Sequence, residues 1–274
     1  MKREGEAGGE AEGTPAQDAE LGRRASGLAG ALSWAVSRTL DAARGAAVAF
    51  SGGVDSSLLS HLAVRSGKPI VLYTAGLPGA PDIAASARAA RLLGMEERLR
   101  VIELAPGEVL EAAGRIIAVV PGASLLEVSF LAPSFIVFER AREGLVLTGD
   151  GADELFGGYH RYLSMGPAEL SSALERDARA LVSGGFERNR RLAERAGKVV
   201  AAPYLDPEVV ELARSIPAEL KVRAGERKAV LRRAAALLGL PRELCALPKR
   251  AAQYGTGIHA LLKKRRSLQP AQRQ

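Results

Sequence analysis

The chain has 274 residues, of which 47% are hydrophobic and 25% are charged, and its formal net charge is +7. These values are ordinary for a globular protein with a sizeable core, and the absence of a bilayer-length apolar run or a hydrophobic N-terminal segment predicts a cytoplasmic protein without membrane contact. Cys245 is the only cysteine, which excludes an intrachain disulfide and a cysteine-rich zinc site.

The N-terminal part of the chain divides into a polar tail and a helix. Residues 1–27 are rich in Gly, Ala and Glu without an apolar period, and we predict a disordered acidic tail there. Residues 28–44 carry apolar side chains at helical spacing, which predicts a helix packed on the domain that follows.

From residue 46 onward, predicted strands alternate with helices. The apolar run 46–50 is typical of a central parallel strand covered on both faces. Further strands are predicted at 69–74, 99–104 and 144–148, and helices at 55–65, 82–93, from the third strand to about 119, and 130–142. This alternation predicts an α/β fold, a doubly wound parallel sheet with right-handed crossovers.

The C-terminal part has a different pattern. From about residue 167 it is helical and rich in arginine, so we expect a helical C-terminal part packed on the sheet. We assign one domain to residues 28–262 and a basic tail to residues 263–274. Basic clusters are more often a solvated surface than a nucleic-acid site, and we do not expect a nucleic-acid partner.

The first strand leads directly into the loop SGGVDSS, residues 51–57, and then into a helix. Gly52 and Gly53 allow a sharp turn and close approach of the backbone to a ligand. The helix that follows points its free N–H groups at the loop, and Ser51, Ser56 and Ser57 add hydroxyl groups. Such a loop favours an anion, most naturally a phosphate group.

An acid, Asp55, stands inside this phosphate loop, where a kinase-type loop has a lysine. A carboxylate beside phosphates is repulsive unless a divalent cation lies between them. Asp55 therefore predicts a bound Mg²⁺ that bridges pyrophosphate oxygens.

A second glycine-containing loop, TGDGADELFGGYHRY, follows the predicted strand 144–148. Ligands of doubly wound sheets bind at the carboxyl ends of strands, where the winding direction reverses. If this strand neighbours the first one, the two loops face each other and Asp153 can share the Mg²⁺ with Asp55. An N-capped helix explains one of the three acids in this loop, but it leaves the cluster of Asp150, Asp153 and Glu154 unexplained.

These motifs resemble the synthetase domain of the asparagine synthetase family, within the PP-loop ATP pyrophosphatases, whose fold is adenine nucleotide alpha-hydrolase-like. SGGVDSS is similar to the pyrophosphate loop of that family, and TGDGADELFGGY is similar to its SGEGADELFGGY signature. The segments GLPGAPD, AAPYLDPEVVELARSIP, KAVLRRAAALLGLP and LPKRAAQYGTGI follow in family order. The resemblance covers about residues 28–262.

The resemblance implies roles for individual residues. Pyrophosphate and Mg²⁺ would be held by Ser51, Gly52, Gly53, Asp55 and Ser56, with Asp153 as the second metal ligand. Phe50, Ala75, Thr148 and Gly149 stand where the family contacts adenosine. Two catalytic residues are implied: Lys249 would neutralise charge on the α-phosphate, and Asp150 occupies the position of a glutamate that assists the ammonia step. Lys228 is a weaker candidate for phosphate contact.

Three features depart from the family pattern. Complete asparagine synthetases begin with a glutaminase domain, which this sequence does not contain, so ammonia is expected from solution or from a separate glutaminase chain. Asp150 is one methylene shorter than the family glutamate. The stretch Ser129 to Pro133 lacks an arginine that could bind a substrate carboxylate.

The resemblance implies an AMP-forming amide ligase that uses ATP and Mg²⁺. A carboxylate, with the β-carboxylate of aspartate as the leading case, would attack ATP and release pyrophosphate, and ammonia would then attack the acyl-adenylate. Two alternatives stay open: a PP-loop enzyme that modifies tRNA, and a non-catalytic ATP-binding subunit.

Overall fold

The computed structural model describes residues 14–247 and 255–268. Its centre is a five-stranded, entirely parallel sheet in the order β3-β2-β1-β4-β5. The strands are β1 (Ala46–Ala49), β2 (Ile70–Gly76), β3 (Leu99–Glu103), β4 (Leu145–Leu147) and β5 (Val199–Ala201). The order confirms the predicted doubly wound sheet. The winding direction reverses between β1 and β4, which pair directly, with Val48 opposite Leu147.

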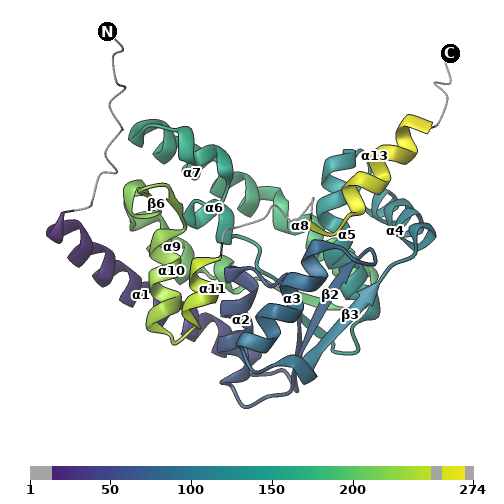
Figure 1. The fold of residues 1–274 in the computed structure, drawn as a ribbon, viewed down its shortest axis with the longest axis horizontal. Helices are drawn as coiled ribbons and strands as arrows, with labels where there is room; N and C mark the ends of the chain where they lie inside the picture. The colour runs from purple at the N-terminus through teal and green to yellow at the C-terminus, as the bar shows by residue number, and fades with distance from the viewer. Residues whose placement is uncertain (1–13, 248–254, 269–274) are drawn as a thin grey trace, which may run out of the picture.

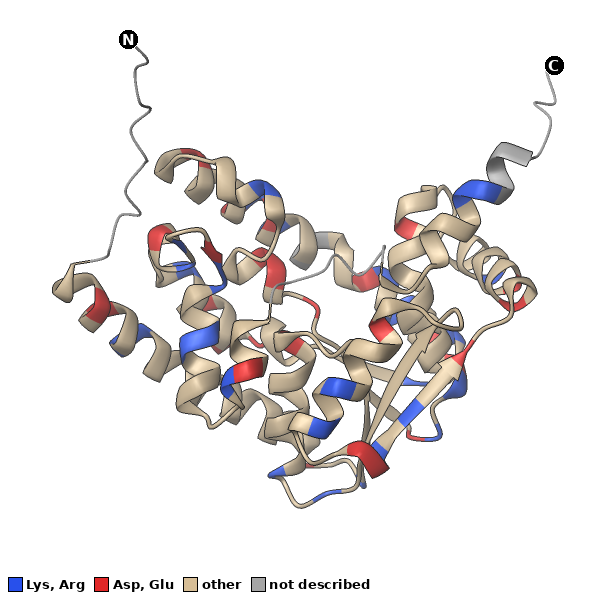
Figure 2. Cartoon of the chain, viewed as in Figure 1, with Lys and Arg blue, Asp and Glu red and all other residues tan. Residues whose placement is uncertain are grey.

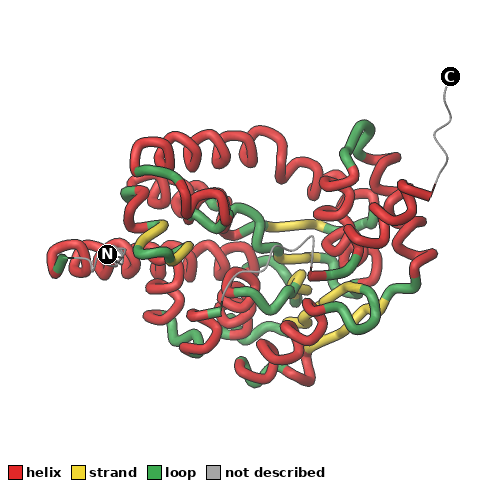
Figure 3. Tube along the Cα trace, turned by 45° about the horizontal axis from the view of Figure 1, so that its top comes forward, coloured by secondary structure: helices red, strands yellow, loops and turns green. Residues whose placement is uncertain are grey.

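Two helical layers cover the sheet, because successive strand residues point to opposite faces. Ala46 and Val48 of β1 join the core under α1 (Pro15–Leu40), α2 (Val54–Val64), α9 (Pro207–Ser215) and α10 (Ala229–Leu237). Ala47 joins the core under α4 (Pro106–Val119), α5 (Leu125–Arg140) and α8 (Phe186–Arg195). Figure 1 shows these layers on either side of the strands, and Figure 3 shows the strands lying between the helices.

The helices of the first half follow the sequence closely. They are α2 (Val54–Val64), α3 (Pro81–Leu92), α4 (Pro106–Val119) and α5 (Leu125–Arg140), with a 3₁₀ turn η1 (Glu96–Arg98) before β3. Helix α5 begins five residues before its predicted start, because Ser124 caps it and Glu127 completes a capping box.

Helix α1 (Pro15–Leu40) corrects the predicted boundary of the disordered tail. It begins thirteen residues before the expected start at residue 28, because Thr14 and Gln17 form a capping box and Pro15 stands at the first helical position. Its buried face starts at Ala25, and Asp18 forms an ion pair with Arg223 at 2.6 Å. Residues 1–13 lie outside the described part of the chain.

The C-terminal half is largely helical, as expected. Its longer helices are α7 (Pro167–Ala180), α8 (Phe186–Arg195), α9 (Pro207–Ser215), α10 (Ala229–Leu237) and α13 (Ile258–Leu268). The shorter elements are α6 (Ala152–Phe156), α11 (Arg242–Ala246), the π turn η3 (Leu181–Gly185), the 3₁₀ turns η2 (His160–Ser164), η4 (Pro203–Leu205) and η5 (Ala218–Leu220), and a hairpin of β6 (Val222–Arg223) and β7 (Glu226–Arg227).

Two sequence expectations for this half were wrong. Strand β5 was missed, because three residues are too short for a periodic signal, and it pairs with β4 at the sheet edge. The predicted basic tail from residue 263 is helical through Leu268, since it continues α13. Among the described residues, no helix has the length and hydropathy that a bilayer crossing requires.

Within the described part of the chain, two of the four arginines of α8 form ion pairs. Arg188 pairs with Glu127 at 2.8 Å, and Arg190 pairs with both Glu187 and Glu194. Figure 2 shows cationic and acidic residues interspersed over the ribbon. Exposed pairs of this kind contribute little to stability, but they offset part of the positive charge of α8.

Candidate active site

The loop between β1 and α2 has the geometry of an anion-binding turn. Gly52 adopts a φ of +74°, and a Cβ atom there would lie 2.6 Å from the carbonyl oxygen of Ala85, so only glycine fits. The Ser56 hydroxyl accepts from the Ser51 amide at 3.2 Å and lies 3.3 Å from the Ser51 hydroxyl. Gly53 is the N-cap of α2 and has no side chain that could cap the helix. The first amides of α2 therefore face the loop.

Asp55 and Asp153 meet on one buried cation. The ammonium group of Lys228 lies 2.5 Å from Oδ2 of Asp55 and 2.6 Å from Oδ1 of Asp153, and the lysine side chain is 1% exposed. The direct pairing of β1 with β4 brings the two loops together, and Lys228 reaches them from the start of α10. Burial lowers the pKa of Lys228, and the neighbouring Asp55 opposes that shift.

Two backbone features make room for the triad of Asp55, Asp153 and Lys228. Lys228 itself has a φ of +60°, which is uncommon for a residue with a side chain. At Gly158, a Cβ atom would lie 1.8 Å from Oδ1 of Asp153 and 2.3 Å from Cε of Lys228. The second glycine of FGGY therefore keeps the space in which the ion pair forms.

The backbone of Asp55 is also held in place by a hydrogen bond. The buried hydroxyl of Tyr204, in η4, donates to the backbone carbonyl of Asp55 at 3.0 Å. On the side of the second loop, a Cβ atom on Gly149 would lie 3.4 Å from that of Asp55. The backbones of the two loops thus approach closely, as the shared-metal prediction requires.

Asp150 is held apart from the triad by other partners. Its Oδ2 accepts from the Thr148 hydroxyl at 2.7 Å and from Nδ2 of Asn189 in α8 at 2.8 Å. Burial raises the pKa of Asp150, and these two hydrogen bonds oppose the shift. The arrangement positions the carboxyl group, and its role in an ammonia step stays a prediction.

The positions expected to contact adenosine follow three neighbouring strands. Phe50 comes directly after β1 and is 2% exposed, Ala75 lies near the end of β2, and Thr148 and Gly149 follow β4. The Phe50 and Thr148 amides donate to Tyr73 and Ala201, so they extend the sheet at its carboxyl edge. Nucleotides bind at this edge of such sheets.

Lys249 lies outside the described residues, but the chain on both sides of residues 248–254 is anchored. Arg232 donates to the carbonyl of Leu247 at 2.9 Å. After the gap, the Thr256 carbonyl accepts from the Leu77 amide at 3.0 Å, and a Cβ atom on Gly255 would clash with the Asp82 carboxylate at 1.8 Å. The segment GLPGAPD and the residues 255–256 are therefore in contact.

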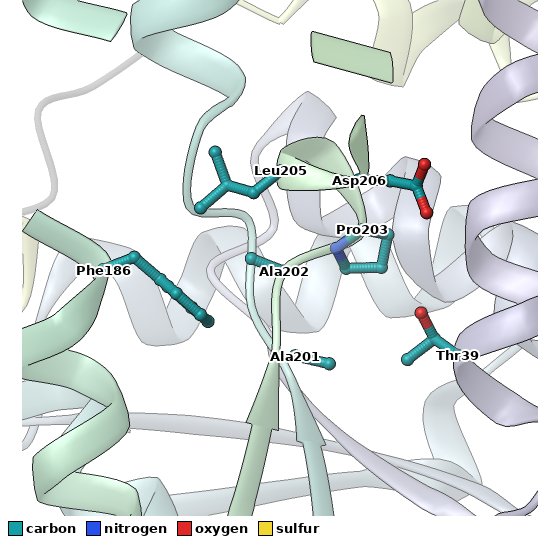
Figure 4. A pocket seen from close by; sticks show the side chains of 7 residues that line it. All are labelled: Thr39, Phe186, Ala201, Ala202, Pro203, Leu205 and Asp206. Atoms are coloured by element: carbon teal, nitrogen blue, oxygen red, sulfur yellow. The ribbon is translucent and has the colours of Figure 1, made fainter. Parts of the chain in front are cut away.

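A pocket of about 340 Å³ opens beyond the end of β5, and its lining includes none of the predicted site residues. Figure 4 shows the residues that line it: Thr39, Phe186, Ala201, Ala202, Pro203, Leu205 and Asp206. Leu205 also supports the second loop, because a Cβ atom on Gly151 would lie 2.7 Å from its Cδ2. The pocket shares a wall with the second loop, while Asp55 and Asp153 lie in the loops that follow β1 and β4.

The residues present fit a magnesium ion that also binds phosphate. No group of three or more His, Cys, Asp and Glu side chains suited to a metal occurs within the described ranges. Mg²⁺ commonly takes one or two protein carboxylates and completes its shell with phosphate oxygens and water. Asp55 and Asp153, which already share one cation, supply such a pair.

Sequence reasoning missed several members of this site. Lys228 was only a weaker candidate, because a lysine in KAVLRR gives no sign of its burial. Tyr204 and Asn189 carry no motif that points to the two loops. Glu154, which accepts a hydrogen bond from the Tyr159 hydroxyl at 2.5 Å, was noted only as part of the acidic cluster.

Comparison with known proteins is consistent with the resemblance. The family model described as "Asparagine synthase" matches residues 27–166 and 163–271. A putative glutamine-hydrolyzing asparagine synthetase from Methanocaldococcus jannaschii is 31% identical over 253 residues, which cover 78% of this chain and 46% of that protein. Mouse asparagine synthetase domain-containing protein 1 is 37% identical over 128 residues, covering 43% of this chain and 20% of that protein.

Among solved structures, the NMN synthetase of Francisella tularensis matches 95% of this chain and 90% of its own, with a TM-score of 0.44 and 13% identity. The chain spans about half the length of the Methanocaldococcus relative and less of the mouse protein. Since the family model matches most of its length, the chain belongs to the asparagine synthase family.

Proposed function

We propose that this chain is an ATP-dependent amide ligase that forms AMP. It adenylates a carboxylate, with the β-carboxylate of aspartate as the leading substrate, and ammonia then displaces AMP to give the amide. The observation that carries this proposal is the convergence of Asp55 and Asp153 on Lys228 beside the Ser51–Ser56 turn. A phosphate loop, two acids and a buried cation together suit the binding of Mg-pyrophosphate.

Each part of the site has a task in this proposal. The loop amides and hydroxyl groups bind the β- and γ-phosphates, and Lys228 balances charge as pyrophosphate leaves. Mg²⁺, when bound by Asp55 and Asp153, would supply further positive charge to the phosphate oxygens. Asp150, held by Thr148 and Asn189, is proposed to orient the incoming ammonia or to accept a proton from its nitrogen as the C–N bond forms. Lys249 is proposed to neutralise charge at the α-phosphate.

Pyrophosphate release tests the proposal. The chain is assayed with ATP, Mg²⁺ and a panel of amino and carboxylic acids, with ammonium or glutamine as nitrogen donor. One acid is expected to stimulate release with ammonium, and glutamine is expected to support amide formation only if a separate glutaminase chain is added. Absence of stimulation by every acid would contradict the ligase proposal.

The same assay separates the alternatives. Release that requires tRNA would identify a tRNA-modifying enzyme, and ATP binding without turnover would identify a non-catalytic subunit. The Lys249→Ala variant is expected to bind ATP and to lose adenylation, and unchanged turnover would contradict its assigned role. We further propose a cytoplasmic location, with small-molecule substrates and no nucleic-acid or membrane partner.

A further inference from the structure

A second, smaller pocket lies behind helix α6, among α6, α7 and the segment from the end of α9 to η5. Its volume is about 180 Å³, which suits a ligand of few atoms, since drug-sized ligands need larger sites. It is lined by Glu154, Leu155, Ser171, Leu174, Glu175, Ala178, Arg214, Ile216, Ala218 and Lys221. The lining combines cations, carboxylates and an apolar wall.

Lys221 is the unusual member of this lining. It is 6% exposed, and its backbone is fixed by hydrogen bonds to Ala218 and from Ala229. Within the part of the chain that the structure describes, its ammonium group has neither an ion pair nor a hydrogen bond. Burial lowers its pKa to about 8, and no acidic neighbour offsets that shift. The Nζ atom keeps some solvent contact, so an anion can reach it. A largely buried cation that no carboxylate balances is costly, which points to an anion that the site receives from solution.

The charged neighbours of Lys221 are mostly engaged elsewhere. Glu154 accepts from the Tyr159 hydroxyl, and Glu175 forms an ion pair with Arg179. Arg214 has no ion pair or hydrogen bond among the described residues. Lys221 and Arg214 are therefore the two cations of the lining that can bind an anion.

The other walls select the class of anion. Two carboxylate side chains line the pocket, and they would repel a dianion such as phosphate more strongly than a monoanion. Leu155, Leu174 and Ile216 supply apolar contact for a short carbon chain. We propose that this pocket binds a small carboxylate, with its oxygens at Lys221 and Arg214.

The pocket is separate from the proposed ATP site but adjoins it through one helix. Glu154 and Leu155 of α6 line the pocket, while Asp153 of the same helix pairs with Lys228. The inference does not require the proposed ligase activity, because the binding can be measured without ATP.

Lysine NMR tests the proposal on the full chain. Lysine labelled with ¹³C at the ε position is observed at pH 8, and the Lys221 signal is assigned with the Lys221→Met variant. Acetate is expected to shift this signal, and inorganic phosphate is expected to bind about tenfold more weakly or worse. No shift with acetate, or tighter binding of phosphate, would overturn the proposal.

Variants supply the matched controls. Acetate binding measured by calorimetry is expected to weaken by about tenfold or more in Lys221→Met and in Arg214→Gln, since each loses a charged hydrogen-bond donor. The exposed Lys263→Met is expected to bind as the unmodified chain does. Equal affinity in all the variants would refute the site.

A third ligand identifies the source of the carboxylate. L-aspartate that binds more tightly than acetate, with the advantage lost in Glu175→Gln, would identify an amino acid ligand. Equal affinity for acetate and L-aspartate, unaffected by Glu175→Gln, would identify a simple carboxylate, and either result supports the site.

Discussion

At the scale of single residues, two buried lysines differ in whether a carboxylate balances their charge. Lys228 is 1% exposed and balanced by two carboxylates, whereas Lys221 has no partner among the described residues. A buried pair is sensitive to loss of one member, because the remaining charge is left unbalanced. A buried single charge is instead a cost that its removal relieves.

Replacement of Lys221 by Met is therefore expected to stabilise the chain. The pKa of Lys221 falls from 10.5 to about 8 on folding, so the unfolded chain holds this proton more tightly. Below pH 8 the penalty is complete, at up to about 3 kcal/mol, and it disappears as the pH rises towards 10.5. Urea unfolding of both proteins at several pH values, without added carboxylates, measures the difference. A less stable variant at pH 7 would contradict the assignment.

The Gly158→Ala substitution tests the space around the triad. Its methyl group would overlap Oδ1 of Asp153 and Cε of Lys228, so these groups must move apart. We expect a loss of about 1–3 kcal/mol in stability and at least a tenfold loss of pyrophosphate release. Gly166→Ala is the control, because no heavy atom lies within 4 Å of a Cβ atom there. Equal activity of the two variants would contradict the packing described.

At the scale of elements, the site depends on short pieces that tie the loops to the helical layer. The 3₁₀ turn η4 supplies Tyr204, α8 supplies Asn189 and the start of α10 supplies Lys228. These pieces are far from the two loops in sequence. The positions of the loops therefore depend on the packing of the C-terminal helices.

The Tyr204→Phe variant measures the contribution of one such contact, the hydrogen bond from Tyr204 to Asp55. The variant loses the hydrogen bond from the Tyr204 hydroxyl to the Asp55 carbonyl, so we expect about 1 kcal/mol of destabilisation and roughly fivefold slower pyrophosphate release. Tyr73→Phe, which loses a 3.5 Å hydrogen bond from the Arg142 amide and an interaction with Glu143 but no bond to Asp55, is the control. Kinetics that match the control would show that this hydrogen bond does not position Asp55.

At the scale of the whole molecule, the charges of Asp55 and Asp153 are balanced within the chain itself. Lys228 already balances Asp55 and Asp153, so the apo chain carries no uncompensated carboxylate pair at this point. Metal binding is then expected to matter for chemistry with ATP more than for folding.

Metal removal tests this expectation. A chelator such as EDTA should abolish ATP-dependent pyrophosphate release and leave the thermal unfolding midpoint of the ATP-free chain unchanged, because Lys228 already balances Asp55 and Asp153. Added Mg²⁺ should restore the release. A large fall in the unfolding midpoint on chelation would instead indicate a structural metal.

The sequence by itself determined the alternation of strands and helices and the two glycine loops. These features are local: the apolar run before SGGVDSS and the Gly52 turn depend on neighbouring residues. Pairing of β1 with β4 confirmed the predicted meeting of the loops. The early start of α1 is also a local feature, because it depends on the capping box of Thr14 and Gln17. The first turns of this helix have small side chains without an apolar period, so the sequence pattern did not predict them.

Only the tertiary structure decided which side chains complete the site. Lys228 is 173 residues from Asp55, and Asn189 is 39 residues from Asp150. No periodicity or spacing reports such pairs, because they depend on how helices α8 and α10 pack against the loops. The same holds for Lys221, whose burial comes from the meeting of α6, α7 and η5 and not from its own neighbours in the chain.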